Sequence, residues 1–126
     1  MVAGGGAALY HCIPALQAAA SQESDEHVAQ GMRLLAIALA APLEQIIINS
    51  GEPAPKVFMQ KICEAGLTAT YDAVQHQVVD AFATGVLDVA DVVAQMLHIA
   101  ASGAMMALST DAIVYHRKPK ESLQPD

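Results

Sequence analysis

The spacing of apolar residues along the chain predicts long helices separated by polar loops. A first helix is expected over residues 6–20, with Pro14 inside it, at a bend or near a helix start. A second is expected over residues 26–49, where Pro42 should introduce a kink and Gly51 should end the helix. Apolar residues recur through this second segment at helical spacing: Val28, Met32, Leu35, Leu39, Leu43, Ile46 and Ile47.

A shorter third helix is predicted between Pro55 and Gly66. Proline is tolerated in the first turn of a helix, and glycine commonly follows the last turn. Four residues of this helix are expected to face the interior: Val57, Phe58, Ile62 and Cys63.

A small β element is expected after the third helix. Residues 68–71 have β-strand character, and residues 75–78 can return as the partner strand. Residues 80–84 predict a single helical turn. A fourth helix is then expected over residues 89–109, with Asp88 as its N-cap.

The fourth predicted helix is apolar on most of its faces, and a helix that is apolar all round is normally buried. The second helix is nearly as apolar, and the remaining elements are too short to cover both. Residues 113–115 predict a last short strand with no obvious partner in the sequence, which leaves an open edge. The pattern therefore predicts a mostly α fold with a small β element, in a chain that is incomplete or oligomeric.

The composition is that of a packed domain rather than a disordered segment. The 126 residues are 54% hydrophobic, 15% charged and only 4% aromatic. The net charge is −7 and the sequence contains no basic stripe, so a nucleic-acid partner is not expected. The longest apolar run, residues 34–43, is short for a bilayer and contains Pro42, so no membrane association is expected.

Two further features favour a cytoplasmic location. The first residues lack the basic and apolar regions of a signal peptide. Cys12 and Cys63 do not form a CxxC pair, and we expect both to be reduced thiols.

Three short motifs suit a binding function, and each also has a purely structural explanation. The triplet Gly4-Gly5-Gly6 opens a helix, where free N–H groups suit a ligand, but the same triplet suits a tight turn. Asp72 suits a turn between two short strands, and Asp88 suits a helix N-cap. The histidines lack metal-ligand spacing, and no phosphate-binding loop is recognisable. We therefore expect no catalytic residue and no metal ligand in this chain.

The order and spacing of these motifs resemble those of a known family. After the glycine triplet come the blocks Ala41-Pro42-Leu43 with Gly51-Glu52-Pro53, Tyr71-Asp72-Ala73-Val74 and Gly85-Val86-Leu87-Asp88. In this order they resemble the C-terminal part of the equatorial domain of GroEL-type (group I) chaperonins, in a divergent copy. The resemblance runs over residues 2–114. It implies that residues 1–118 form the C-terminal half of a chaperonin-like equatorial domain and that residues 119–126 form a polar tail.

The resemblance implies a mostly helical fragment of an equatorial domain that contributes to an ATP site. By this resemblance Gly5 would lie against the nucleotide. The carboxylate of Asp88 would bind the ribose hydroxyls, and Val86 would pack near the base.

A second part of the implied site lies in the β element, where Asp72, Ala73 and Val74 would lie around the adenine. The family has Asn in place of Asp72 and Ala in place of Val74. An ionised carboxylate accepts hydrogen bonds but cannot donate one as an amide does. The larger side chain of Val74 would also crowd the base.

The function implied by the resemblance is that of a part of an ATP-dependent chaperonin subunit, which assists protein folding in a ring of identical subunits. Unfolded client proteins and a co-chaperonin would bind through other domains. The phosphate and Mg²⁺ ligands of the family lie in the other half of the equatorial domain, so we expect this chain alone not to hydrolyse ATP.

Glu44 stands where the family has a basic residue that meets an acidic turn of the opposite ring. The contact would bring like charges together, so assembly into a double ring is not expected. The alternative to the nucleotide-binding hypothesis is a non-catalytic structural or interaction module, from a degenerate copy without nucleotide binding.

Overall fold

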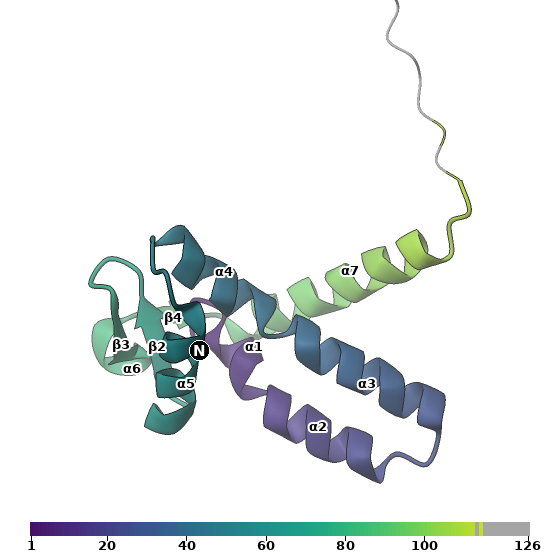
Figure 1. Cartoon of the computed structure of the whole chain (residues 1–126), viewed down its shortest axis with the longest axis horizontal. Helices are drawn as coiled ribbons and strands as arrows, with labels where there is room; N and C mark the ends of the chain where they lie inside the picture. Colours follow the sequence, from purple (N-terminus) through teal and green to yellow (C-terminus); the bar gives the residue numbers. More distant parts are fainter. Residues whose placement is uncertain (113, 115–126) are drawn as a thin grey trace, which may run out of the picture. The chain divides into compact units, whose positions relative to one another are not determined.

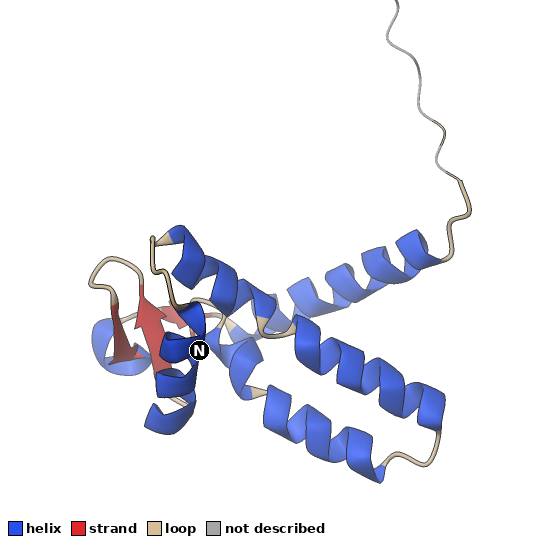
Figure 2. Cartoon of the chain, in the orientation of Figure 1, coloured by secondary structure: helices blue, strands red, loops and turns tan. Residues whose placement is uncertain are grey.

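The computed structural model describes residues 1–112 and 114, in two compact units, Met1–Ala94 and Gln95–Asp126. Most of the described residues are helical, and the strands are short (Figures 1 and 2). The predicted fold class, mostly α with a small β element, is confirmed. The helices are α1 (Ala7–His11), α2 (Ile13–Gln22), α3 (Glu26–Ala38), α4 (Ala41–Asn49), α5 (Pro55–Ala65), α6 (Ala81–Thr84) and α7 (Ala90–Leu108). The strands are β1 (Val2–Ala3), β2 (Ala69–Asp72), β3 (Gln77–Asp80) and β4 (Leu87–Asp88).

Each of the first two predicted helices is broken into two shorter ones. Cys12 separates α1 from α2, and Pro14 is the second residue of α2. Leu39 and Ala40 separate α3 from α4, and Pro42 is the second residue of α4. A proline ring clashes with the carbonyl four residues earlier, so the preceding helix must end there. The expected kink at Pro42 is thus a break just before it.

Helices α2 and α3 lie side by side as an antiparallel pair (Figure 1). Their contact is made by small residues, because Ala20, Ala29 and Ala36 are buried. The carboxylate of Asp25 caps α3 by accepting from the N–H groups of His27 at 2.9 Å and Val28 at 3.4 Å.

The larger hydrophobic core lies between α4, α5 and β2. It consists of Leu43, Ile47, Met59, Ile62, Ala69 and Tyr71. The rings of Phe58 and Tyr71 meet edge to face, with centroids 5.2 Å apart. Met59 is buried in this core while Val57 and Cys63 are exposed, so the predicted interior face of α5 was partly wrong.

The predicted hairpin is confirmed: β2 and β3 pair antiparallel, with Ala69 opposite Asp80 and Asp72 opposite Gln77. Asp80 ends the hairpin and caps α6, accepting from the N–H groups of Phe82 at 3.0 Å and Ala83 at 2.9 Å. The helical turn predicted over residues 80–84 is therefore present as α6.

A second strand pair, β1 with β4, was not predicted. Val2 lies opposite Asp88 and Ala3 opposite Leu87, in antiparallel register. Asp88 is therefore a strand residue, and the prediction that it caps the fourth helix is wrong. Helix α7 begins after Val89, whose carbonyl accepts the N–H of Val93 at 3.1 Å.

A second, smaller core lies beside this strand pair. It consists of Ala3, Ala7 and Ala81, with Leu87 packed against them. Ala3 belongs to β1, Ala7 to α1 and Ala81 to α6, so the start of the chain is packed onto the segment around α6 and β4.

Helix α7 agrees with the predicted fourth helix in position, but none of its residues is buried. Its apolar side chains include Ile99, which is 71% exposed, and Met106, which is 68% exposed. The strand predicted over residues 113–115 and the tail predicted over residues 119–126 lie outside the described residues, apart from Val114.

By length and apolar composition, two helical stretches of the described chain are able to cross a membrane, Glu26–Asn49 and Ala90–Leu108. The first is interrupted by the break between α3 and α4. Core helices of water-soluble proteins meet the same criteria, so these stretches are weak evidence for a membrane. The expectation of no membrane association stays a prediction.

The carboxylate of Asp80 should make the stability of the fold depend on pH. The hydroxyl of Thr68 donates to it at 2.6 Å, and this bond, with those from Ala83 and Phe82, lowers the pKa of Asp80 below its usual 3.8. A lowered folded-state pKa stabilises the fold at higher pH, and the stabilisation is lost as the pH falls through that lowered value.

We therefore predict that the stability difference between the wild type and Asp80→Asn is constant above about pH 5 and shrinks between about pH 4 and pH 2. Urea unfolding across this range measures it. Other carboxylates are common to both proteins and cancel in the difference. Parallel loss of stability by the two proteins would show that Asp80 is not the group responsible.

Candidate functional site

The glycine triplet lies where three segments of the chain meet. The N–H of Gly4 donates to the carbonyl of Val86 at 2.9 Å, which extends the β1–β4 pairing by one bond. The hydroxyl of Thr70 donates a hydrogen bond to the carbonyl of Gly4, with 2.7 Å between the two oxygens. Gly4 therefore connects β2 to the segment that leads into β4.

The glycines also allow backbone segments to approach more closely than side chains would permit. A Cβ on Gly6 would lie 2.8 Å from the backbone nitrogen of Leu43, and Gly6 has φ of +82°. A Cβ on Gly4 would lie 3.0 Å from the carbonyl carbon of Leu87. The first contact faces the larger core and the second the smaller one. The tight-turn explanation of the triplet is thus correct, and it leaves Gly5 partly exposed between the two contacts.

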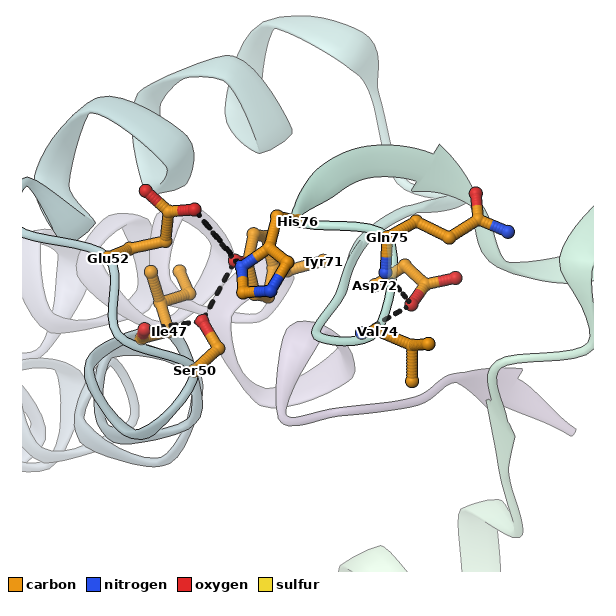
Figure 3. Close-up of polar contacts among 8 residues, drawn as sticks. All are labelled: Ile47, Ser50, Glu52, Tyr71, Asp72, Val74, Gln75 and His76. Carbon is orange, nitrogen blue, oxygen red and sulfur yellow. Dashed lines mark hydrogen bonds and ion pairs between the residues drawn. The ribbon is translucent and has the colours of Figure 1, made fainter.

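Asp72 closes the turn of the hairpin, as the structural explanation of this residue predicted. One carboxylate oxygen accepts from the N–H groups of Val74 at 2.8 Å and Gln75 at 3.0 Å (Figure 3). The second oxygen of Asp72 makes no hydrogen bond to the described residues. Ala73 and Val74 form the tip of the turn and are exposed, with Val74 at 88%.

A polar cluster anchors this turn to the end of α4, as Figure 3 shows. The Tyr71 side chain is 2% exposed, and its hydroxyl lies 2.9 Å from Oγ of Ser50 and 3.4 Å from Nδ1 of His76. The carboxylate of Glu52 lies 3.2 Å from the same His76 nitrogen. Ser50 in turn donates to the carbonyl of Ile47 at 2.7 Å.

This polar cluster was not predicted from the sequence. Its members come from α4, the following turn and the hairpin, and their spacing along the chain carries no periodic signal. Tyr71 and Asp72 are consecutive, so the cluster also fixes the position of the hairpin turn that Asp72 closes.

Asp88 and Val86 form the third part of the candidate site. Both are partly buried, and the backbone of Val86 is held by its bond to Gly4. The carboxylate of Asp88 makes no hydrogen bond within the described part of the chain, although its backbone is paired with Val2. It is free to accept hydrogen bonds from a ligand.

Among the predicted site residues, Gly5 lies close to β2 and to the segment of Val86, whereas Ala73 and Val74 do not share this junction. Gly5 lies against β2, where an added Cβ would be 3.4 Å from the Thr70 hydroxyl, and next to Gly4, which is bonded to Val86. Ala73 and Val74 are on the exposed tip of the turn. Within residues 1–112 and 114, no group of three His, Cys, Asp or Glu side chains is arranged to hold a metal ion.

Glu44 has a partner within the chain. Its carboxylate lies 2.7 Å from Nζ of Lys56 on α5, and its side chain is 28% exposed. Part of its negative charge is thereby neutralised before any other subunit approaches, which weakens the like-charge argument against a ring-to-ring contact.

A cavity of about 230 Å³ lies apart from these residues, between the start of α2 and the end of α5. Its lining consists of Tyr10, His11, Ile13, Pro14, Cys63, Gly66 and Leu67. The pKa of Tyr10 is raised above its usual value, mainly by burial of the hydroxyl and to a smaller extent by the nearby Cys63. The cavity is smaller than the roughly 300–1,000 Å³ of typical small-molecule sites.

Comparison with known proteins agrees with the sequence-based resemblance. A profile of the TCP-1/cpn60 chaperonin family matches residues 1–118. The chaperonin GroEL of Neorickettsia risticii is 33% identical over 125 residues, covering 99% of this chain and 22% of the relative. The chaperonin GroEL of Neorickettsia sennetsu is 33% identical over 122 residues, covering 97% of this chain and 22% of the relative. The chain thus spans about a fifth of the length of these curated relatives.

The close approach at Gly6 leads to a matched pair of predictions about stability. Gly6→Ala places a Cβ against the Leu43 backbone at positive φ, and should destabilise the fold by about 1–3 kcal/mol. Gly31→Ala changes an exposed helical glycine of α3 with open space around it, and should stabilise by about 0.5–1 kcal/mol. Urea unfolding of the two variants measures both effects. Equal changes in the two variants would contradict the packing described for Gly6.

Proposed function

The chain belongs to the TCP-1/cpn60 chaperonin family, and on that basis we propose that it supplies the nucleoside side of an ATP pocket in a chaperonin subunit that assists protein folding. The observation that carries the proposal is the position of Gly4. Its backbone is bonded both to Thr70 of β2 and to Val86 before β4, so residues assigned to the pocket from distant parts of the sequence share one junction.

The free carboxylate of Asp88 has the chemistry needed to bind a ribose. An ionised carboxylate accepts hydrogen bonds from two hydroxyl groups, and bonds to charged groups are stronger than neutral ones. Val86, two residues earlier and partly buried, offers an apolar surface to the base. Gly5 has no side chain to obstruct the approach of a nucleotide to the backbone.

Asp72 acts differently from the Asn that the family has at this position. One of its oxygens is occupied by the two N–H groups of the turn, so the turn itself is well held. The other oxygen accepts but does not donate, and it suits the exocyclic amino group of adenine. The base would thus be held mainly by this oxygen and by Val86, while the exposed Val74 moves aside at little cost.

The proposal excludes hydrolysis by this chain alone. Phosphoryl transfer needs ligands for the phosphates and for Mg²⁺, together with a residue that orients water. In this proposal, those groups belong to parts of a chaperonin subunit that correspond to none of the residues described here.

Partners follow from the same proposal. Identical subunits would form a ring in the cytoplasm, and client proteins and a co-chaperonin would bind through other domains. The uncovered apolar side chains of α7, such as Met96 at 59% and Ile99 at 71% exposed, would be covered within that assembly.

The alternative proposal is a structural module without nucleotide binding, and specific observations favour it. Close packing at Gly4 and Gly6 accounts for the glycine triplet, and the turn bonds account for Asp72. The carboxylate of Asp88, in contrast, makes no hydrogen bond in the described part of the chain, so no structural role accounts for it. Asp88 therefore distinguishes the two proposals.

We predict that the chain binds a fluorescent adenine nucleotide and that Asp88→Ala weakens this binding about tenfold or more, because charged hydrogen bonds to the ribose are lost. Asp91→Ala, which removes the same charge from the first turn of α7, should bind like the wild type. Fluorescence titration of the three proteins gives the dissociation constants. Equal affinities for the two variants, or no binding by the wild type, would favour the structural module.

A further inference from the structure

Thr70 is a buried polar residue at the junction of the candidate site. Its side chain is 0% exposed, and no other polar or charged residue of the described chain belongs to the buried class. It lies in β2 opposite Val79, two residues before Asp72. A buried hydroxyl needs a hydrogen-bond partner, and Thr70 finds it in the carbonyl of Gly4 at 2.7 Å.

The carbonyl of Gly4 accepts two hydrogen bonds, and they act differently. The N–H of Ala7 donates to it at 3.2 Å, but Ala7 belongs to the same segment and moves with it. Among the described residues, the Thr70 hydroxyl is the donor that ties this carbonyl to the hairpin. The bond therefore holds the glycine segment against β2, and the end of α1 is held to the same strand by a 2.9 Å contact between Nε2 of His11 and the carbonyl of Ala69.

Gly4 is also hydrogen-bonded to the segment before β4, through its backbone N–H. Its N–H donates to Val86 at 2.9 Å, and Val86 lies two residues before Asp88. One hydroxyl thus links, through Gly4, the strand that leads to the Asp72 turn with the segment that leads to Asp88. Threonine suits the task, because its branched Cβ restricts χ1 and leaves the hydroxyl little freedom in a packed interior.

The hydroxyl also limits the space beneath Gly5. A Cβ at Gly5 would lie 3.4 Å from the Thr70 oxygen, so the backbone of Gly5 rests on this side chain. Loss of the hydrogen bond would let the glycine segment move away from β2 and take Gly5 with it.

We propose that Thr70 is a positioning residue for nucleoside binding, whose hydroxyl holds Gly5 at its working distance from Asp72 and Asp88. Thr70 touches no nucleotide in this account and acts through Gly4. The inference rests on the proposed function, because it assumes that these three residues form one pocket.

The test compares Thr70→Val, which keeps the shape and removes the hydroxyl, with Thr70→Ser, which keeps the hydroxyl. Thr68→Val is the matched control, because it removes a hydroxyl bond of similar length that goes to Asp80 instead of Gly4. Two quantities are measured on the full chain: the affinity for a fluorescent adenine nucleotide, and the hydrogen exchange of the Gly4 amide, which is bonded to Val86.

We expect Thr70→Val to weaken nucleotide binding about fivefold and to speed exchange of the Gly4 amide by at least a similar factor. Thr70→Ser and Thr68→Val should remain within about twofold of the wild type in both measurements. If Thr70→Val does not fold, Thr70→Ala takes its place with the same expectation.

Unchanged nucleotide affinity in Thr70→Val, or failure of Thr70→Ser to keep wild-type affinity, would overturn the inference. A wild type that binds no nucleotide would overturn the proposed function and the inference together. In that case, faster hydrogen exchange of the Gly4 amide in Thr70→Val would show that Thr70 has a structural role without a role in binding.

Discussion

The backbone of Gly4–Gly6 approaches three other segments of the chain so closely that it determines how α4, β2 and β4 meet. Gly6 packs on Leu43 of α4, Gly4 packs on Leu87 of β4, and Thr70 of β2 bonds to the Gly4 carbonyl. The two hydrophobic cores lie on either side of this junction. Any side chain at Gly4 or Gly6 would separate segments that the sequence places about 40 to 80 residues apart.

The same junction connects the fold to the proposed function. The hairpin turn is held from inside by the Asp72 carboxylate and from the α4 side by the Tyr71 hydroxyl (Figure 3). The β4 strand is held by its pairing with β1. The segments that carry Asp72 and Asp88 are thus each connected to the glycine segment, the first through the Thr70 hydroxyl and the second through the strand pairing of β1 with β4. In the proposed function, the Asp72 turn would contact the base and Asp88 the ribose.

Helices and the hairpin were predictable from sequence, because their signals are local. Pro14 and Pro42 correctly indicated where the first two predicted helices are irregular, and in the structure each helix is broken just before its proline. The β1–β4 pair was not predictable, because two-residue strands far apart in sequence carry no periodicity. Asp88 was consequently mistaken for a helix cap. Gly5, Asp72 and Asp88 were proposed as site residues from the family resemblance, and that assignment stays a prediction. The Thr70 bond and the Tyr71 cluster depend on tertiary contacts that leave no local signal in the sequence.

We propose that the glycine segment, the hairpin turn and β4 together form one nucleoside site. The most direct test is an NMR titration of the ¹⁵N-labelled chain with an adenine nucleotide, following every backbone amide. If they do, the shifted amides will be those of residues 4–6, 72–75 and 86–88. No shifts, or shifts confined to the cavity beside Tyr10 and Cys63, would contradict it.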